Sequence, residues 1–283
     1  HEQNSVPGIT NRMLSRFALE VHLNLASARR HFPRRGHLKL SGSPMRQGIL
    51  GGEGARAAQE LGLDGRAHTV VILGGSQGAR SINRAAVGAV RRLARRTDLQ
   101  FIIQTGKRDF KWVQQRTRGA RCRVVVRPFI EKMGDIYQLA DLVVARAGAM
   151  TLAELTACGK ASILVPFPHA THNHQEANAR DLQQAGAAEL ILDRDLRGAV
   201  LAERIAKLID TPRKLREMSN NALIMARPDA AEKIAEAILS SAGGTVLNGS
   251  AAASARARAS SSVVVPSPSS SSSLPPALGD ARS

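Results

Sequence analysis

The sequence is poor in aromatic residues and in cysteine. Phe, Tyr and Trp make up 3% of its 283 residues, with one Trp and one Tyr, which argues against a surface on which nucleic acid bases stack. Its two cysteines, Cys122 and Cys158, are too few for a disulfide framework or a paired metal motif, and this is typical of a reducing compartment. No apolar run approaches the roughly 18 residues of a membrane span. A disulfide-stabilised miniprotein is therefore excluded, and no membrane span is expected.

Acidic residues are outnumbered by basic ones. The chain has 40 Lys and Arg against 23 Asp and Glu, a formal net charge of +17. Such a charge favours a polyanionic partner or an anionic membrane surface, or reflects a composition biased toward arginine. Basic residues occur in short groups, such as Arg91-Arg92 and Arg95-Arg96. Two interpretations remain open: solvated helix faces, or a patch that faces lipid headgroups.

The two ends of the sequence differ from the rest of it. The chain begins with His1 rather than Met, so we expect it to lack upstream sequence. Residues 243–283 are rich in Ala, Ser and Pro, and such a composition buries too little apolar surface to offset the entropy of ordering it. We therefore expect this tail to be disordered.

Between these ends, short apolar segments alternate with helical patterns. Six segments read as strands: 68–73, 99–104, 123–126, 141–145, 161–165 and 188–192. Strands that alternate with helices favour parallel pairing, with helices over both faces of the sheet. The predicted fold class is α/β, a doubly wound parallel sheet, whose ligand lies at the carboxyl ends of the strands. Helices over about 196–241, broken by Pro212 and Pro228, are expected to pack back across the domain boundary.

Two loops that open helices are suited to phosphate. The loop of Gly74, Gly75, Ser76, Gln77 and Gly78 offers a tight turn and free amides at the positive end of a helix. It matches neither the Walker loop nor the GxGxxG fingerprint, and a plain turn capped by Ser76 is the alternative. The second loop, over 146–151, again offers small residues and free amides.

Glu154 has two possible roles. With Thr151 it forms a Thr-x-x-Glu capping box at the start of a helix. Alternatively, its carboxylate grips the two hydroxyls of a ribose. A third loop, over 166–175, carries His169, His172 and His174 without Cys or carboxylate, so we expect sugar contacts there and no metal. Together the three loops predict a nucleotide-sugar site.

The same residues resemble the bacterial MurG glycosyltransferase family. The similarity lies in Gly74-Gly-Ser-Gln-Gly-Ala-Arg80 with Asn83, in Arg146-Ala-Gly-Ala-Met-Thr-x-x-Glu154-Leu155, and in Val165-Pro-Phe-Pro-His-Ala170 with His174-Gln175-x-x-Asn178-Ala179. The segments His1-Glu-Gln-Asn4, Gly8-Ile-Thr-Asn11 and Gly42-Ser-Pro-Met-Arg46 follow the family's order and spacing. The family motifs thus run from His1 to Asn178, and the helices that follow match to Ser241.

The resemblance implies a GT-B fold, of which this chain is the C-terminal, donor-binding half. Residues 1–40 would be a remnant of the N-terminal acceptor-binding domain, 41–242 the UDP-sugar-binding domain with its closing helices, and 243–283 the tail. It implies an inverting transferase that moves N-acetylglucosamine from UDP-N-acetylglucosamine to lipid I, the undecaprenyl-pyrophosphoryl-muramyl pentapeptide, and so makes lipid II for peptidoglycan. The enzyme would lie peripherally on the cytoplasmic face of the bacterial inner membrane, with an anionic membrane surface as partner. It would need no cofactor, bind no nucleic acid and be inactive as this part alone.

The resemblance also assigns site residues. Ser76 and its neighbours would face the nucleotide and phosphates, Arg46 and Ile130 the uracil, and Glu154 the ribose. The full donor-binding set is Arg46, Gly74, Gly75, Ser76, Gln77, Gly78, Ile130, Ala149, Met150, Thr151, Glu154, His174 and Gln175. His1, Glu2, Asn4 and Asn11 would lie on the acceptor side of the cleft. The general base would belong to the upstream domain.

The sequence departs from the family at a few positions. Ser43 replaces the usual Asn, Ala145 stands where Cys is common, and His172-Asn173 replace acidic residues before His174. The alternatives are another GT-B transferase that uses a UDP-sugar, an inactive fragment, or a basic module that binds polyanions. The pattern over His1–Asn11 argues against the first of these. Saturable UDP binding with little salt dependence distinguishes a transferase from a polyanion-binding module.

Overall fold

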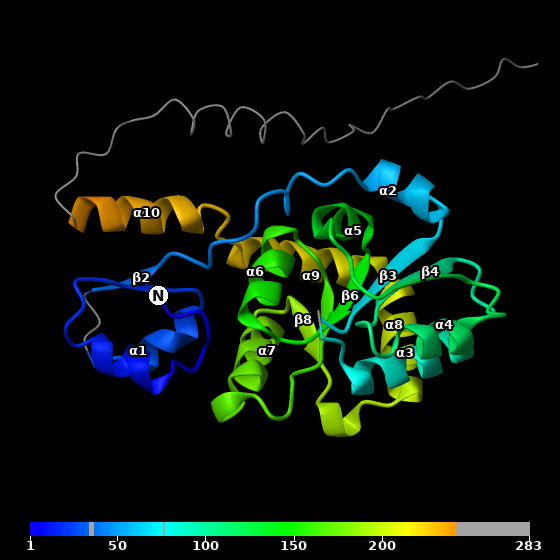
Figure 1. Cartoon of the computed structure of the whole chain (residues 1–283), viewed down its shortest axis with the longest axis horizontal. Coiled ribbons are helices and arrows are strands. Elements are labelled where there is room, and N and C mark those ends of the chain that lie inside the picture. The colour runs from blue at the N-terminus through cyan, green and yellow to red at the C-terminus, as the bar shows by residue number, and fades with distance from the viewer. Residues whose placement is uncertain (34–36, 76, 242–283) are drawn as a thin grey trace, which may run out of the picture.

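A six-stranded parallel sheet forms the centre of the molecule (Figure 1). The computed structural model describes residues 1–33, 37–75 and 77–241. The strand order is β5-β4-β3-β6-β7-β8. The strands are β3 (His68–Leu73), β4 (Leu99–Gln104), β5 (Arg123–Arg127), β6 (Leu142–Ala145), β7 (Ser162–Leu164) and β8 (Ala188–Leu190). Each predicted strand is confirmed to within two residues at each end, and the predicted doubly wound α/β fold is confirmed.

Helices cover both faces of the sheet. The helices are α2 (Gly54–Leu61), α3 (Arg80–Leu93), α4 (Phe110–Thr117), α5 (Met133–Leu139), α6 (Ala149–Ala157), α7 (His174–Gln184), α8 (Gly198–Ile209), α9 (Pro212–Met225) and α10 (Ala230–Ser241), with 3-10 turns η2 (Thr171–Asn173) and η3 (Asp193–Asp195). None of the helices in the described residues combines the length and apolar character needed to cross a bilayer.

The apolar strands divide their side chains between two cores. Val70 and Ile72 of β3 pack with α3 and α8 on one face, whereas Val71 and Leu73 pack with α5 and α6 on the other. Both faces of a parallel sheet are covered, so its strands are apolar throughout rather than alternating. This burial explains why unbroken runs such as Thr-Val-Val-Ile-Leu were readable as strands.

The first forty residues form a small separate layer. Strands β1 (Val21–Leu23) and β2 (Leu38–Leu40) pair in parallel, flanked by α1 (Ile9–Leu14) and the 3-10 helix η1 (Ala26–His31). Their own core contains Leu23, Ala28 and Phe32. Three-residue strands carry too little pattern to be read locally, and the sequence predicted none here. Helix α10 lies beside this layer, where Lys233 and Ala237 line a groove with Glu20 and Lys39.

Candidate functional site

The loops that follow β3 and β6 meet at the point where the chain changes direction over the sheet. After β3 the chain forms α3 on one face, and after β6 it forms α6 on the other. In doubly wound sheets a crevice opens outside the carboxyl ends of two such strands. A cavity of about 280 Å³ lies here, lined by Arg46, Leu73, Gly75, Gln104, Phe129, Ile130, Met133, Tyr137, Ala145, Arg146, Thr151 and Glu154. This cavity is the candidate ligand site.

Glu154 is the acidic group of the cavity, and two side chains hold it. Its side chain is 8% exposed. Arg46 donates to Oε1 from Nη2 at 3.1 Å, and the Tyr137 hydroxyl donates to Oε2 at 3.0 Å. The Arg46 side chain is 55% exposed and has room to move into solvent, whereas Tyr137 is buried. A bound ligand with two neighbouring hydroxyls can therefore take the place of Arg46 while Tyr137 keeps the carboxylate oriented.

Tyr137 is expected to stay protonated well into the alkaline range. Burial, with the adjacent Glu154 carboxylate, raises the pKa of its hydroxyl well above the ordinary value of 10.0. The contribution of this pKa shift to the free energy of unfolding is fully present below pH 10.0, and it is lost as the pH rises through the raised pKa. Because the chain has one tyrosine, an alkaline absorbance titration reports on Tyr137 alone. We expect native protein to show no tyrosinate near pH 10.0, whereas the urea-unfolded chain titrates there. Equal titration of both forms would contradict the contact with Glu154.

The glycine loop between β3 and α3 is confirmed as a tight turn. Gly75 and Gly78 have φ of +77° and +80°, values that interrupt a right-handed helix. Helix α3 therefore begins at Arg80. Gly75 lines the cavity, whereas Gly74 and Gln77 of the same loop do not. The predicted contact of Ser76 lies outside the described residues.

The predicted capping box of Thr151 and Glu154 is wrong. Helix α6 begins at Ala149, with Gly148 as its N-cap and no side-chain cap. Thr151 is thus inside the first turn, and Glu154 turns into the cavity toward Arg46 and Tyr137 instead. The amides of Ala149, Met150 and Thr151 belong to the first turn, whose N–H groups have no partner within the helix. They form a positive helix end beside a buried carboxylate.

Arg146, which the sequence reading did not assign to the site, joins three loops. Its Nη1 donates to Asp193 at 2.6 Å and to the carbonyl of Pro166 at 3.0 Å, and its Nη2 donates to Ser81 at 2.9 Å. The guanidinium carbon also lies 5.6 Å from the ring centre of Phe167. Arg146 thereby fixes the start of α6 relative to the loop after β7 and to α3.

Gln104 and Tyr137 are further residues of the site that the sequence reading missed. The Gln104 side chain accepts a hydrogen bond from the Ile130 amide at 3.0 Å. Ile130 lines the cavity, and its main-chain N–H already has this hydrogen-bond partner. Its predicted contact with uracil stays a prediction. A polar residue at the end of an apolar strand was the available signal for Gln104. For Tyr137 no local signal existed, since its helix reads as ordinary core.

The loop after β7 lies apart from the cavity lining. Gln175 accepts from the Phe167 amide at 3.0 Å, and His174 Nδ1 lies 2.7 Å from the Thr171 carbonyl. Neither lines the cavity, nor do Gly74, Gln77, Gly78, Ala149 and Met150. The sugar contacts predicted for His174 and Gln175 stay predictions. Across residues 1–33, 37–75 and 77–241, no three His, Cys, Asp or Glu side chains gather in a way that could hold a metal ion.

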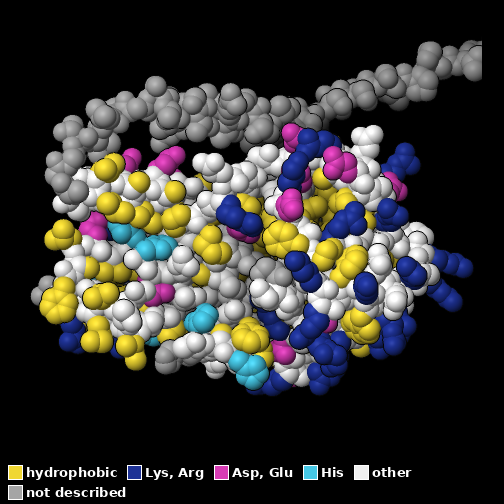
Figure 2. Space-filling model, viewed as in Figure 1, with side chains coloured by type: hydrophobic (Ala, Val, Ile, Leu, Met, Phe, Trp, Pro, Cys, Tyr) yellow, Lys and Arg dark blue, Asp and Glu magenta, His cyan; other side chains and the backbone are white. Residues whose placement is uncertain are grey.

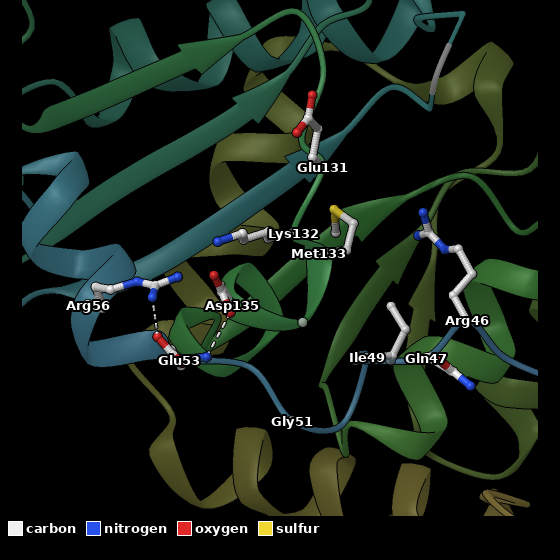
Figure 3. Close-up of a pocket in the computed structure, with 12 residues that line it drawn as sticks. Arg46, Gln47, Ile49, Gly51, Glu53, Arg56, Glu131, Lys132, Met133 and Asp135 are labelled. Carbon is white, nitrogen blue, oxygen red and sulfur yellow. Dashed lines mark hydrogen bonds and ion pairs between the residues drawn. The ribbon is translucent and has the colours of Figure 1, made fainter.

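A second cavity, of about 340 Å³, adjoins the first and shares Arg46 and Met133 with it (Figure 3). On its far side Arg56 forms an ion pair with Glu53 at 2.6 Å, and the Asp135 carboxylate accepts from the Glu53 amide at 2.7 Å. These charged groups already have partners. Glu154 in the first cavity is also paired, but its buried carboxylate lies beside the first turn of α6, so that cavity is the better suited of the two to a ligand with hydroxyls and phosphates.

The segment predicted to face an acceptor is organised around Glu2. Its carboxylate is 2% exposed and accepts from the Asn4 amide and from the Asn11 side chain, each at 2.8 Å. His1 Nε2 lies 2.8 Å from the Gly42 carbonyl. The structure therefore brings His1, Glu2, Asn4 and Asn11 together, although the Glu2 carboxylate is already hydrogen-bonded within this segment. Their contact with an acceptor stays a prediction.

Asn178 joins this segment to the loop after β6. Its Oδ1 accepts from the Ser5 amide at 2.8 Å, and its Nδ2 donates to Asn4 at 3.1 Å and to the Ala147 carbonyl at 3.2 Å. Asp181 of the same helix accepts from the hydroxyls of Ser5 and Ser27. Residues 1–5 thus lie at a fixed place beside the start of α6.

Comparison with known proteins gives a consistent result. The model of the glycosyltransferase family 28 C-terminal domain matches residues 69–234. The UDP-N-acetylglucosamine--N-acetylmuramyl-(pentapeptide) pyrophosphoryl-undecaprenol N-acetylglucosamine transferase of Thermodesulfovibrio yellowstonii is 45% identical over 236 residues, 83% of this chain. The protein of the same name from Desulforudis audaxviator is 40% identical over 249 residues, 86% of this chain.

A solved structure supports the same relationship. The crystal structure of Acinetobacter baumannii MurG matches with a TM-score of 0.70 and 30% identity, over 85% of this chain and 66% of that one. The chain spans 64% of the length of the Thermodesulfovibrio relative and 67% of the Desulforudis relative. The similarity therefore covers the fold and the candidate site, and roughly a third of each relative has no counterpart in this chain.

Proposed function

The chain belongs to glycosyltransferase family 28, and on this premise we propose that it supplies the donor-binding part of a transferase. The donor would be UDP-N-acetylglucosamine and the acceptor lipid I, with lipid II as product, as the names of its relatives suggest. The observation that carries the proposal is the position of the buried Glu154 carboxylate beside the first turn of α6, in the crevice between β3 and β6.

The cavity offers complementary groups to a nucleoside diphosphate. Glu154, once Arg46 moves away, can accept hydrogen bonds from both hydroxyls of a ribose. The first turn of α6 and the glycine loop offer amides to the two phosphates. Ile130 and Phe129 supply an apolar edge for the base. Arg46 would then be free to pair with the base or with a phosphate.

The reaction would be an inverting displacement. The acceptor hydroxyl attacks the anomeric carbon, a new carbon–oxygen bond forms, and the bond from that carbon to the diphosphate breaks. The acceptor's proton passes to a general base that we place outside this chain. The helix end and the loop amides would stabilise the negative charge that develops on the leaving UDP, as preorganised hydrogen-bond donors do in other group transfers. No cofactor is required for this step.

The proposed place of action is the cytoplasmic face of the bacterial inner membrane, where the enzyme would lie peripherally. A lipid-linked acceptor requires the enzyme to work at a membrane surface. The net charge of +17 supports attraction to anionic lipid headgroups. Nucleic acid is not proposed as a partner, since the chain has few aromatic residues for base stacking.

Titration calorimetry tests the donor site directly. We expect UDP and UDP-N-acetylglucosamine to bind saturably, in the micromolar to millimolar range, with little dependence on salt. ADP should bind more weakly, because the proposed donor carries uracil rather than a purine. An absence of binding heat at millimolar UDP would overturn the proposal.

A further inference from the structure

Gln104 is a buried polar residue at the end of an apolar strand. All six residues of β4 are buried, and Gln104 is 6% exposed and lines the candidate donor cavity. Its main-chain carbonyl accepts a hydrogen bond from the Gly74 amide at 2.9 Å, so its side chain starts from a fixed point. Because a buried primary amide destabilises a protein unless it is hydrogen-bonded, both ends of this side chain need a partner.

The hydrogen bond from Ile130 sets the direction of the Gln104 amide. The Ile130 N–H can face only an acceptor, so Oε1 lies on that side and the NH2 group points away from it. Within the part of the chain that the structure describes, Nε2 has no hydrogen-bond partner, yet it is not among the enclosed polar atoms that lack one. The NH2 group is therefore open to the cavity, with two N–H donors to offer a ligand.

Gln100, at the other end of β4, shows the contrasting case. Its Nε2 donates to Thr69 Oγ1 and to the Asp64 carbonyl, each at 2.9 Å, and its Oε1 accepts from the Asp64 amide at 2.9 Å. Both ends of that amide hold parts of the protein together. Gln104 is thus the glutamine of β4 that keeps its donors for a ligand.

The base of a bound nucleotide would lie beside Gln104. The proposed function places the ribose at Glu154, on the helix after β6, and the base at Ile130, to which Gln104 is bonded. In the sheet β3 lies between β4 and β6, so the ends of β4 and β6 are about 10 Å apart, at roughly 4.8 Å per strand. A pyrimidine carries its C2 carbonyl next to the ribose and its C4 substituent on the far side. Gln104 therefore faces the C4 substituent.

Charge does not choose between bases. Lys and Arg side chains gather over α3 and α4 at the right and lower right of the space-filling view (Figure 2). This positive surface attracts the phosphates of any nucleoside diphosphate, whichever base it carries. Selection among bases requires groups that read the edge of the base, and hydrogen-bond donors at fixed positions do this.

We propose that Gln104 is a specificity-determining residue, whose Nε2 donates a hydrogen bond to the C4 carbonyl of a uracil base. The inference rests on the proposed function, which places a UDP-sugar in this cavity. Cytosine carries an amine at C4, so two N–H donors would face each other and neither would have an acceptor. A buried donor without a partner weakens binding by roughly 5- to 150-fold. UDP should therefore bind more tightly than CDP by a factor in this range.

Titration calorimetry with the full chain compares UDP and CDP at fixed ionic strength. The variant Gln104→Met removes the donors and should lower the preference for UDP over CDP by about fivefold or more. Gln104→Glu keeps an oxygen for the Ile130 amide and places a second oxygen where the donors were, so the preference should shift further toward CDP. The matched control Gln138→Glu adds the same charge at an exposed position on α5, outside the cavity lining, and should keep the preference of the unaltered chain within about twofold.

The ratio of the two affinities separates this inference from the proposed function. If the unaltered chain binds neither nucleotide, the proposed function fails, and this inference fails with it. If the unaltered chain binds UDP and CDP equally, or if both Gln104 variants keep its preference for UDP, Gln104 does not read the base, and the inference is overturned although the donor site stands. Melting temperatures identify a variant that does not fold, and the comparison of UDP with CDP on the unaltered chain tests the inference even then.

Discussion

Replacing Glu154 by glutamine should weaken UDP binding by about 1–3 kcal/mol, roughly 5- to 150-fold. The substitution keeps the shape of the side chain but removes the charge that strengthens its hydrogen bonds to ribose hydroxyls. Titration calorimetry at fixed ionic strength measures the effect. The fold should tolerate the change, because the amide oxygen of glutamine can still accept the hydrogen bond from Tyr137, and Arg46 is 55% exposed to water.

The matched control is Glu176→Gln. Glu176 lies on α7, where it pairs with Arg180 at 2.6 Å, outside the cavity lining. The substitution Glu176→Gln removes the same charge and should leave the UDP affinity unchanged within twofold. If both variants bind UDP equally well and as tightly as the unaltered chain, Glu154 does not hold the ribose. If both weaken binding equally, the effect is one of net charge.

Substituting alanine at Gly78 should destabilise the fold far more than the same change at Gly75. Both residues have positive φ, and placing a Cβ there costs about 1–2 kcal/mol. At Gly78 the new Cβ would also lie 2.4 Å from the Thr105 carbonyl oxygen, whereas at Gly75 nothing lies within 4 Å. The neighbour is main chain and cannot rotate away, so overpacking adds about 1–3 kcal/mol.

Urea unfolding of the two variants, with unchanged m-values, gives the difference directly. We expect Gly75→Ala to lose about 1–2 kcal/mol and Gly78→Ala about 2–5 kcal/mol. The comparison isolates the close approach of the glycine loop to the loop after β4, because the backbone strain is common to both. Equal losses would mean that the two loops do not touch as described.

The fold class and the separate parts of the candidate site follow from residue patterns alone. Six apolar runs separated by helical patterns sufficed for a doubly wound sheet, because strands buried on both faces carry the same apolar signal at every position. The similarity to family 28 confirms that this is the C-terminal half of a GT-B fold. The glycine loop was equally readable, since the positive φ of its turn depends on local residues.

How these parts act together depends on long-range packing. Arg46 and Glu154 are 108 residues apart, and they meet because the segment between β2 and α2 runs past the crevice beside α6. The capping box failed for the same reason: Thr-x-x-Glu is a local pattern, but burial against Tyr137 gave Glu154 a partner that no local pattern contains. Local residue patterns fix the elements, whereas burial and strand order fix which side chains meet.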